Sequence, residues 1–295
     1  MKLARRQKLR RTPRFKGQTI NKMIPHIITV SAMCVGLTAI RFGLDGKWEF
    51  AVGAIVIAGA LDALDGRMAR LLKVSSEFGA VLDSLSDFVC FGVAPALVLF
   101  FWSLQELGGF GWGLALFFPV CCALRLARFN SMDGKLPPYA YNYFAGAPAP
   151  AGAGLCLLPM ILSFAFDLEL AIYPIVPAIW IALVALLMVS QIPTYSFKSI
   201  KVPNRFVLPF FVVMGLLFAG IAGRPWETLT LCLVAYLVSF PFSVRSFNKL
   251  KSEAEHLHDS QLETTALVTD EDDDGEGGED DDTSVRRNST NLRPV

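Results

Sequence analysis

Long apolar stretches separated by short polar or charged loops fill the chain from residue 24 to residue 246. A helix that crosses a membrane needs about 20 mostly apolar residues. The stretches of roughly this length are 24–43, 49–71, 80–103, 110–129, 151–167, 169–190, 206–222 and 228–246. The pattern therefore predicts an all-α integral membrane protein with about eight transmembrane helices.

The two ends of the chain differ from this apolar body in charge. Residues 1–16 hold eight Lys or Arg and no acid, whereas residues 253–282 hold 14 of the 26 Asp and Glu. We predict a basic cytoplasmic or interfacial segment at 1–22, a multi-span membrane domain at 23–250 and a disordered acidic cytoplasmic tail at 251–295. The net charge of +1 only averages these opposite ends. We expect membrane lipids and no nucleic acid as partners.

The composition excludes an ordinary soluble protein. Charged residues make up 18% of the chain and hydrophobic residues 53%, whereas soluble domains carry about 25% charged residues. The six cysteines lie in apolar runs without the spacing of metal ligands. They are expected to be small apolar core residues rather than a disulfide framework.

Lys and Arg residues alternate between the loops and so predict an orientation. With the N-terminus in the cytoplasm, the inner loops carry three basic residues each at 67–73, 125–135 and 198–205. The outer loops then carry only Lys47 and Arg224. This asymmetry follows the positive-inside rule and places both termini in the cytoplasm.

Four aspartates interrupt the second and third predicted spans. Each charged residue inside a membrane helix costs about 2.5–3.5 kcal/mol on insertion scales. Asp62 and Asp65 are three residues apart and share one helix face, and Asp83 and Asp87 are four apart and share another. The link between the two spans is short, so both pairs lie near the cytoplasmic ends of antiparallel helices and can face each other.

Such a cluster favours a metal site. Carboxylates that face one another repel unless protons or cations lie between them. Ligand sets made only of oxygen suit Mg²⁺ or Mn²⁺, and two such ions can clamp a pyrophosphate. Gly66 and Gly79 leave room for a ligand beside the acids, and Arg70 offers a phosphate donor.

Other interpretations of these residues remain open. The acids fit an ion or proton pathway, or structural pairing with Arg67 or Arg70. The glycines also suit close helix packing, and Arg70 suits a loop that only sets orientation.

The spacing of these residues favours the metal-site interpretation, because it resembles the motif of a known family. The chain contains Asp62-x2-Asp65-Gly66-x2-Ala69-Arg70-x8-Gly79-x3-Asp83-x3-Asp87. These eight fixed residues across 26 positions resemble the signature of the CDP-alcohol phosphatidyltransferase family. The resemblance implies transfer of a phosphatidyl or related group from a CDP-linked lipid to an alcohol, with release of CMP. It also implies a core of six membrane helices, here with extra helices, a metal-bearing cavity open to the cytoplasm, and a homodimer.

The flanking sequence resembles one branch of that family, the bacterial type II phosphatidylserine synthases. The similar stretches are 24–29, 78–87, 91–96, 125–130, 146–151 and 187–193. This branch implies CDP-diacylglycerol and L-serine as substrates and the bacterial inner (cytoplasmic) membrane as the location. The chain departs from the family at His26, where the family often has Asn.

The resemblance implies roles for individual residues. Asp62, Asp65, Asp83 and Asp87 would bind two divalent cations, Mg²⁺ or Mn²⁺, and Asp87 would also take the proton of the serine hydroxyl. The residues implied in binding the CDP-lipid are Pro25, His26, Thr29, Gly66, Arg70, Ser76 and Gly79. For Pro25 and His26 the plain alternative is the start of a helix, and for Ser76 it is a loop serine.

Arg125, Arg128 and Asn130 end the fourth predicted span on the cytoplasmic side. They are candidates for binding the carboxylate of serine, because Arg pairs with carboxylates through two hydrogen bonds. An equally good interpretation is an interfacial pair of arginines that sets orientation.

Two rival functions remain. Within the family, the acceptor alcohol would be glycerol 3-phosphate, which needs further cationic residues, or choline, which needs an aromatic cage. Outside the family, a cation-coupled transporter would use the four acids as its ion site. Transporters commonly contain inverted repeats, and here the acids are confined to one helix pair without a counterpart in the second half.

Overall fold

The computed structural model describes residues 20–72, 76–132, 143–168, 173–190, 193–195, 207–243 and 245. By its internal contacts the chain divides into Met1–Phe247 and Asn248–Val295, and all described residues belong to the first unit. The predicted basic segment at 1–22 lies outside the described residues except for its last three, and the predicted acidic tail lies outside them entirely. The three predicted parts of the chain stay predictions.

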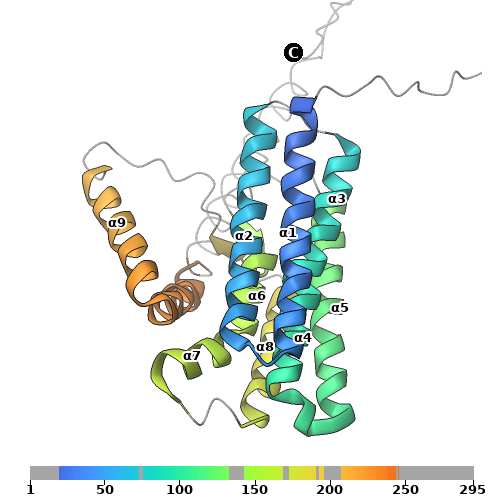
Figure 1. The fold of residues 1–295 in the computed structure, drawn as a ribbon, viewed down its shortest axis with the longest axis vertical. Coiled ribbons are helices and arrows are strands. Elements are labelled where there is room, and N and C mark those ends of the chain that lie inside the picture. The colour runs from blue at the N-terminus through green and yellow to red at the C-terminus, as the bar shows by residue number, and fades with distance from the viewer. Residues whose placement is uncertain are drawn as a thin grey trace, which may run out of the picture. The chain divides into compact units, whose positions relative to one another are not determined.

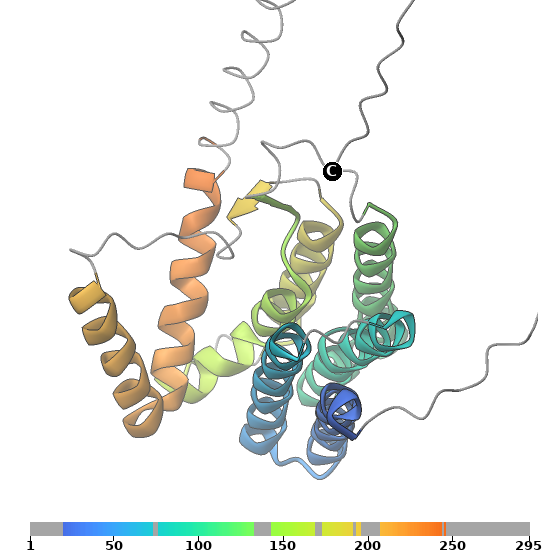
Figure 2. The same ribbon diagram turned by 90° about the horizontal axis from the view of Figure 1, so that it is seen from above.

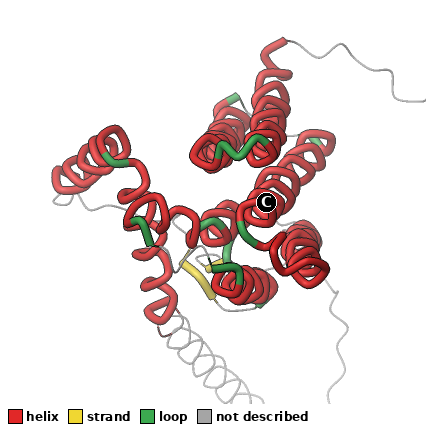
Figure 3. Tube along the Cα trace, turned by 60° about the horizontal axis from the view of Figure 1, so that its bottom comes forward, coloured by secondary structure: helices red, strands yellow, loops and turns green. Residues whose placement is uncertain are grey.

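Helices form nearly all of the described chain, which confirms the predicted all-α class (Figure 1). In chain order they are α1 (Ile20–Leu44), α2 (Trp48–Leu71), α3 (Glu77–Asp87), the π-helix η1 (Phe88–Val93), α4 (Ala94–Trp102), the 3₁₀-helix η2 (Leu104–Leu107), α5 (Gly108–Met132), α6 (Ala149–Cys156), α7 (Leu158–Phe166), α8 (Ile175–Val189), α9 (Val207–Gly223) and a last helix, Pro225–Ser243. Two short strands, β1 (Tyr143–Ala145) and β2 (Pro193–Tyr195), pair antiparallel and are drawn in yellow in Figure 3.

Each of the eight predicted spans coincides with a helical segment, although not all of these segments are equally suited to cross a membrane. Four are long and apolar enough: Met23–Leu44, Glu77–Trp102, Leu104–Ser131 and Pro225–Ser243. The bent pair α6 and α7 makes a fifth if it is counted as one span. Of the other three, α2 carries aspartates and arginines in its second half, and α8 and α9 have only 15 and 17 residues.

The alternative interpretation of Pro25 and His26 as a helix start does not hold. Helix α1 begins at Ile20, so Pro25 lies inside it. A proline removes one backbone hydrogen bond of a helix, and here that bond lies close to the helix start. Residues 20–23 include Asn21 and Lys22, so the apolar pattern alone places the start of the span at residue 24.

The predicted span at 151–167 is bent by 49° between α6 and α7. Pro159 lies in the first turn of α7 and has no N–H to offer the carbonyl of Leu155. The indole Nε1 of Trp180 donates to that carbonyl instead, at 2.6 Å. The bend therefore leaves no loss of hydrogen bonding at Leu155, and it ties α6 to α8.

Helix α1 packs against α2 and against the helix formed by α3, η1 and α4 (Figure 2). Small side chains permit this close approach. A Cβ atom on Gly36 would lie 2.6 Å from the Sγ atom of Cys90, and that Sγ donates to the carbonyl of Ala32 at 3.4 Å. Because α1 touches both acid-bearing helices, it fixes how they lie relative to each other.

The π-helix η1 begins directly after Asp87. In a regular α-helix the ring of Pro95 would press against the carbonyl of Phe91. The wider turn relieves this contact, and the N–H of Ala94 donates to the carbonyl of Val89, five residues earlier. Single π turns of this kind are frequent at functional sites.

We predict that Gly36→Ala destabilises the protein, because the added methyl group must displace Cys90. Overpacking of this kind costs about 1–3 kcal/mol. The measurement is the apparent melting temperature of the purified protein in detergent. Gly53→Ala in α2 is the matched control, since a Cβ atom there would meet no atom within 4 Å. Equal melting temperatures for the two variants would contradict the packing of α1 described above.

Candidate active site

Three of the four aspartates meet between α2 and α3. One carboxylate oxygen from each of Asp62, Asp83 and Asp87 lies within 4.8 Å of the other two. All three side chains are half-buried, and Oδ1 of Asp87 is buried without a hydrogen-bond partner among the described residues. Three anionic groups at this separation repel one another strongly. The cluster is therefore suited to a hard divalent cation, which prefers carboxylate oxygens.

Asp65 faces α1 and lies outside this group of three. It is only 4% exposed. The hydroxyl Oγ1 of Thr29 lies 2.6 Å from Oδ2 of Asp65 and 3.0 Å from the carbonyl oxygen of Pro25, so one proton serves two acceptors. Thr29 thus anchors Asp65, and a role for Asp65 as a metal ligand stays a prediction.

Arginine pairing does not hold the acids in the described part of the chain. The ion pairs found there are Asp45–Lys47 and Arg224–Glu227, both remote from the cluster in sequence. Arg70 instead donates from Nε to the carbonyl of Gly66 at 3.0 Å, on its own helix, and its side chain is exposed. The structural-pairing interpretation therefore finds no support in the described contacts of Arg67 and Arg70.

The two glycines of the motif have different surroundings. A Cβ atom on Gly79 would lie 2.5 Å from Cε1 of His26, whereas one on Gly66 would meet no atom within 4 Å. Close helix packing therefore explains why residue 79 is a glycine. It does not explain Gly66, whose backbone is open to a ligand beside the acids.

Ser76 and His26 join the start of α3 to the start of α1. Ser76 is the N-cap of α3, and its Oγ accepts a hydrogen bond from the N–H of Gly79 at 3.0 Å. The same Oγ lies 3.4 Å from Nε2 of His26. The His26 ring also meets Phe78 edge to face, with 5.7 Å between ring centroids. His26, in the second turn of α1, is therefore held beside the motif.

The three residues predicted to bind serine have different surroundings in the structure. Arg125 is half-buried, its Nε has no hydrogen-bond partner among the described residues, and it lies within electrostatic range of Asp87. Arg128 donates to the carbonyl of Val189 at 3.2 Å and so joins α5 to α8. Asn130 donates to Oγ of Ser84 at 3.0 Å.

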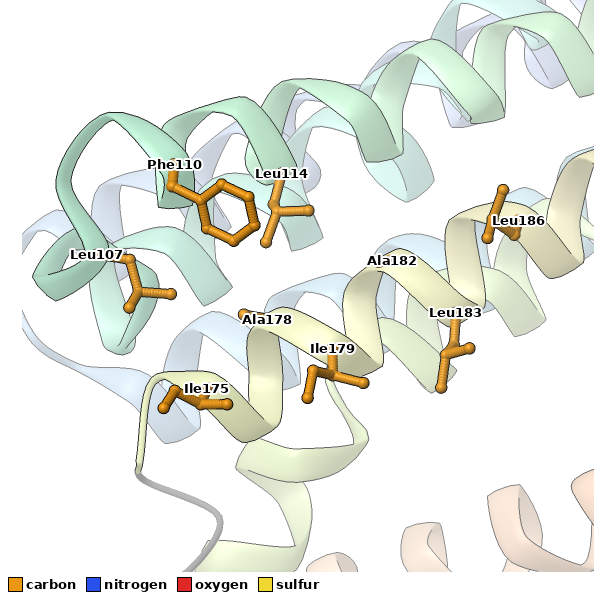
Figure 4. Close-up of a pocket in the computed structure, with 9 residues that line it drawn as sticks. All are labelled: Leu107, Phe110, Leu114, Ile175, Ala178, Ile179, Ala182, Leu183 and Leu186. Atoms are coloured by element: carbon orange, nitrogen blue, oxygen red, sulfur yellow. The ribbon is translucent and has the colours of Figure 1, made fainter.

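A pocket of about 320 Å³ lies between η2, α5 and α8, towards the other end of α5 (Figure 4). Its nine lining residues are all apolar and include Leu107, Phe110 and Ile175. It offers no side chain that binds a metal ion or a nucleotide. Among the described residues, the groups suited to hold a metal ion lie in the aspartate cluster instead.

Comparison with known families supports this location. A family model described as CDP-alcohol phosphatidyltransferase matches residues 22–190, more than half of the chain, and this range includes all four aspartates. The chain belongs to the CDP-alcohol phosphatidyltransferase family. A second model, CDP-alcohol phosphatidyltransferase 2, matches residues 205–241, which cover α9 and most of the last helix.

Several curated relatives carry the name CDP-diacylglycerol–serine O-phosphatidyltransferase. The Mycobacterium bovis protein is 35% identical over 259 residues, which are 86% of this chain and 90% of the relative. The Helicobacter pylori (strain 26695) protein is 32% identical over 216 residues, 73% of this chain and 88% of the relative. The Bacillus subtilis protein is 38% identical over 181 residues, 61% of this chain and 94% of the relative.

Two residues near the site were missed by the sequence reasoning. Ser86 is 2% exposed and donates to the carbonyl of Thr29 at 3.3 Å, which links α3 to α1 beside Asp87. Tyr236 lies on the last helix and within electrostatic range of Arg125. A polar residue inside an apolar span was the available signal in both cases.

We predict that a divalent cation stabilises the protein through the aspartate cluster. A ligand present at 100 times its Kd stabilises the folded state by about 2.7 kcal/mol, so Mn²⁺ should raise the apparent melting temperature. Asp83→Asn should remove most of this rise. Asp45→Asn, which alters an exposed loop residue, is the matched control. An undiminished Mn²⁺ effect in Asp83→Asn would place the cation elsewhere.

Proposed function

We propose that this family member makes phosphatidylserine. It transfers the phosphatidyl group from CDP-diacylglycerol to L-serine and releases CMP. The observation that carries the proposal is the cluster of Asp62, Asp83 and Asp87 on the family motif. The serine acceptor is supported by relatives named for that reaction, which align with up to 86% of the chain.

Two divalent cations, Mg²⁺ or Mn²⁺, are proposed to bind at this cluster. Asp62, Asp83 and Asp87 supply oxygens close together, and Asp65 is the fourth proposed ligand. Bound cations would neutralise the phosphate oxygens of the donor and stabilise the charge that develops during transfer.

Asp87 is the proposed general base. An alcohol is a poor nucleophile until its proton has an acceptor, and Oδ1 of Asp87 is a buried acceptor without a partner among the described residues. As this oxygen takes the proton, the serine oxygen attacks the phosphorus that carries the diacylglycerol. The bond between this phosphorus and the oxygen of the CMP phosphate breaks, and CMP leaves with the bonding electron pair.

The residues around the cluster are proposed to hold the two substrates. The backbone at Gly66 is open to the CDP-lipid, and the exposed guanidinium of Arg70 can reach its phosphates. His26 and Ser76 lie on the α1 side of the same motif. Arg125 is the proposed partner of the serine carboxylate, because it is the arginine that lies near Asp87.

Pro25, Thr29 and Gly79 shape the site by packing. Thr29 orients Asp65, and its hydroxyl also lies against the carbonyl of Pro25. Gly79 gives His26 room. Arg128 and Asn130 are proposed to support the acceptor side indirectly, through their hydrogen bonds to Val189 and Ser84.

The proposed location is the bacterial cytoplasmic membrane, with the site and both termini facing the cytoplasm. The basic residues of the predicted inner loops support this orientation. A homodimer is proposed from the family resemblance alone.

The deciding experiment is a turnover assay with purified protein, CDP-diacylglycerol and Mn²⁺ or Mg²⁺. We expect CMP release that requires L-serine and stops with EDTA. Glycerol 3-phosphate, choline and inositol, offered separately, should give none. Release with another of these alcohols would keep the reaction class and reject serine. No release with any acceptor, from well-folded protein, would favour the transporter.

We predict that Asp87→Asn lowers kcat by at least about 10²-fold, the low end of the contribution of a general base. The amide cannot accept the serine proton, whereas most of the donor site remains. CDP-diacylglycerol binding should therefore persist in a direct binding measurement. Asp45→Asn, at the exposed loop after α1, should behave as the parent protein. Normal turnover in Asp87→Asn would remove the proposed base.

A further inference from the structure

A chain of buried hydrogen bonds connects the two acid-bearing helices through α1, which contacts both of them (Figure 1). On the α2 side, Oγ1 of Thr29 donates to Oδ2 of Asp65 at 2.6 Å. On the α3 side, the carbonyl oxygen of Thr29 accepts from Oγ of Ser86 at 3.3 Å. All three residues are buried. Water therefore has little access to these bonds, and a partner that is lost here is not readily replaced.

The hydroxyl of Thr29 has one proton and two neighbouring acceptors. The carbonyl oxygen of Pro25, one turn earlier on α1, lies 3.0 Å away, and a contact of this kind is common for a threonine within a helix. The carboxylate of Asp65 is closer, at the distance expected for a hydroxyl that donates to a charged oxygen. The proton is therefore directed to Asp65, and the hydroxyl cannot at the same time donate to a substrate.

We propose that Thr29 is a positioning residue for the divalent-cation site and not a contact for the CDP-lipid. Its hydroxyl fixes one carboxylate oxygen of Asp65, which leaves the other oxygen as the ligand atom. Its carbonyl holds Ser86, the residue directly before Asp87. The inference rests on the proposed function, in which Asp65 and Asp87 bind cations. It replaces the contact with the CDP-lipid that the family resemblance implied for Thr29.

The physical reason is that a metal ion binds best to ligands whose orientation is fixed in advance. Partners that hold a metal ligand by a hydrogen bond contribute about 10- to 100-fold in metal affinity. A carboxylate that no partner holds can rotate about its single bonds, and it loses this freedom when a cation binds. Because Thr29 lies on neither acid-bearing helix, it can fix the acids of α2 and of α3 relative to each other.

The test is the Mn²⁺ affinity of the full-length protein in detergent without substrates, measured from the electron paramagnetic resonance signal of free Mn²⁺. Thr29→Val keeps the shape of the side chain and removes the hydroxyl. We expect the Kd for Mn²⁺ to rise about tenfold, and Thr29→Ser, which keeps a hydroxyl, to retain most of the affinity. Thr38→Val is the matched control, because Thr38 is an exposed threonine whose hydroxyl donates to the carbonyl of Cys34 on the same helix.

A second variant tests the α3 side of the proposal and does not leave Asp65 without its donor. Ser86→Ala removes the hydrogen bond to the carbonyl of Thr29 and should also raise the Kd for Mn²⁺. All affinities are measured well below the melting temperature of each variant, so that a loss of stability alone does not change them. An unchanged Kd in Ser86→Ala would overturn the α3 side of the proposal.

Steady-state turnover separates this inference from the function on which it rests. Thr29→Val should need about tenfold more Mn²⁺ for half-maximal CMP release, with an unchanged KM for CDP-diacylglycerol at saturating Mn²⁺. An unchanged Kd for Mn²⁺, a raised KM for the donor lipid, or an equal loss of affinity in Thr29→Ser would overturn the positioning role. Parent protein that binds no Mn²⁺, or that releases CMP without serine, would instead overturn the proposed function.

Discussion

Carboxylates that gather inside a membrane domain lose hydration and repel one another. The packing of the first three spans holds them close together in spite of this free-energy cost. Asp62, Asp83 and Asp87 come from two helices and meet without an arginine ion pair among the described residues. Such a cluster is tolerated where cations are to bind. Burying these carboxylates without a cation costs free energy, and a bound cation would offset that cost. This fits a metal-dependent transferase better than a purely structural role.

Helix α1 supplies most of the support for these acids although it contributes none of them. Thr29 holds Asp65 through its hydroxyl and holds Ser86 of α3 through its carbonyl. One residue thus fixes an element of each acid-bearing helix. Further along α1, Gly36 permits contact with Cys90. The relative register of α2 and α3 is consequently set by a third helix, which explains why α1 is packed so closely.

The sequence predicted the helices well because length and apolarity decide whether a segment forms a membrane helix. It also predicted that the acids of α2 and α3 converge, since their spacing places each pair on one face. It did not predict the separate environment of Asp65, because Thr29 on another helix determines it. The sequence also did not reveal that His26 packs against Gly79, whereas the space beside Gly66 is open. The bend after α6 is accompanied by a single hydrogen bond from Trp180 that an apolar pattern does not encode, and the start of α1 at Ile20 lies in a polar stretch outside that pattern.

The π-helix after Asp87 has a consequence for the whole third span. A π turn holds one residue more than an α turn, and one residue corresponds to a rotation of about 100° around the helix axis. Loss of that extra residue would leave α4 packed as it is and turn Asp83 and Asp87 away from Asp62. The π turn therefore rotates the helix face before it relative to the helix face after it, within one continuous helix. It lets the half before the π turn present its aspartates to Asp62 and the half after it pack into the apolar core, two demands that a regular helix of the same sequence would bring into conflict.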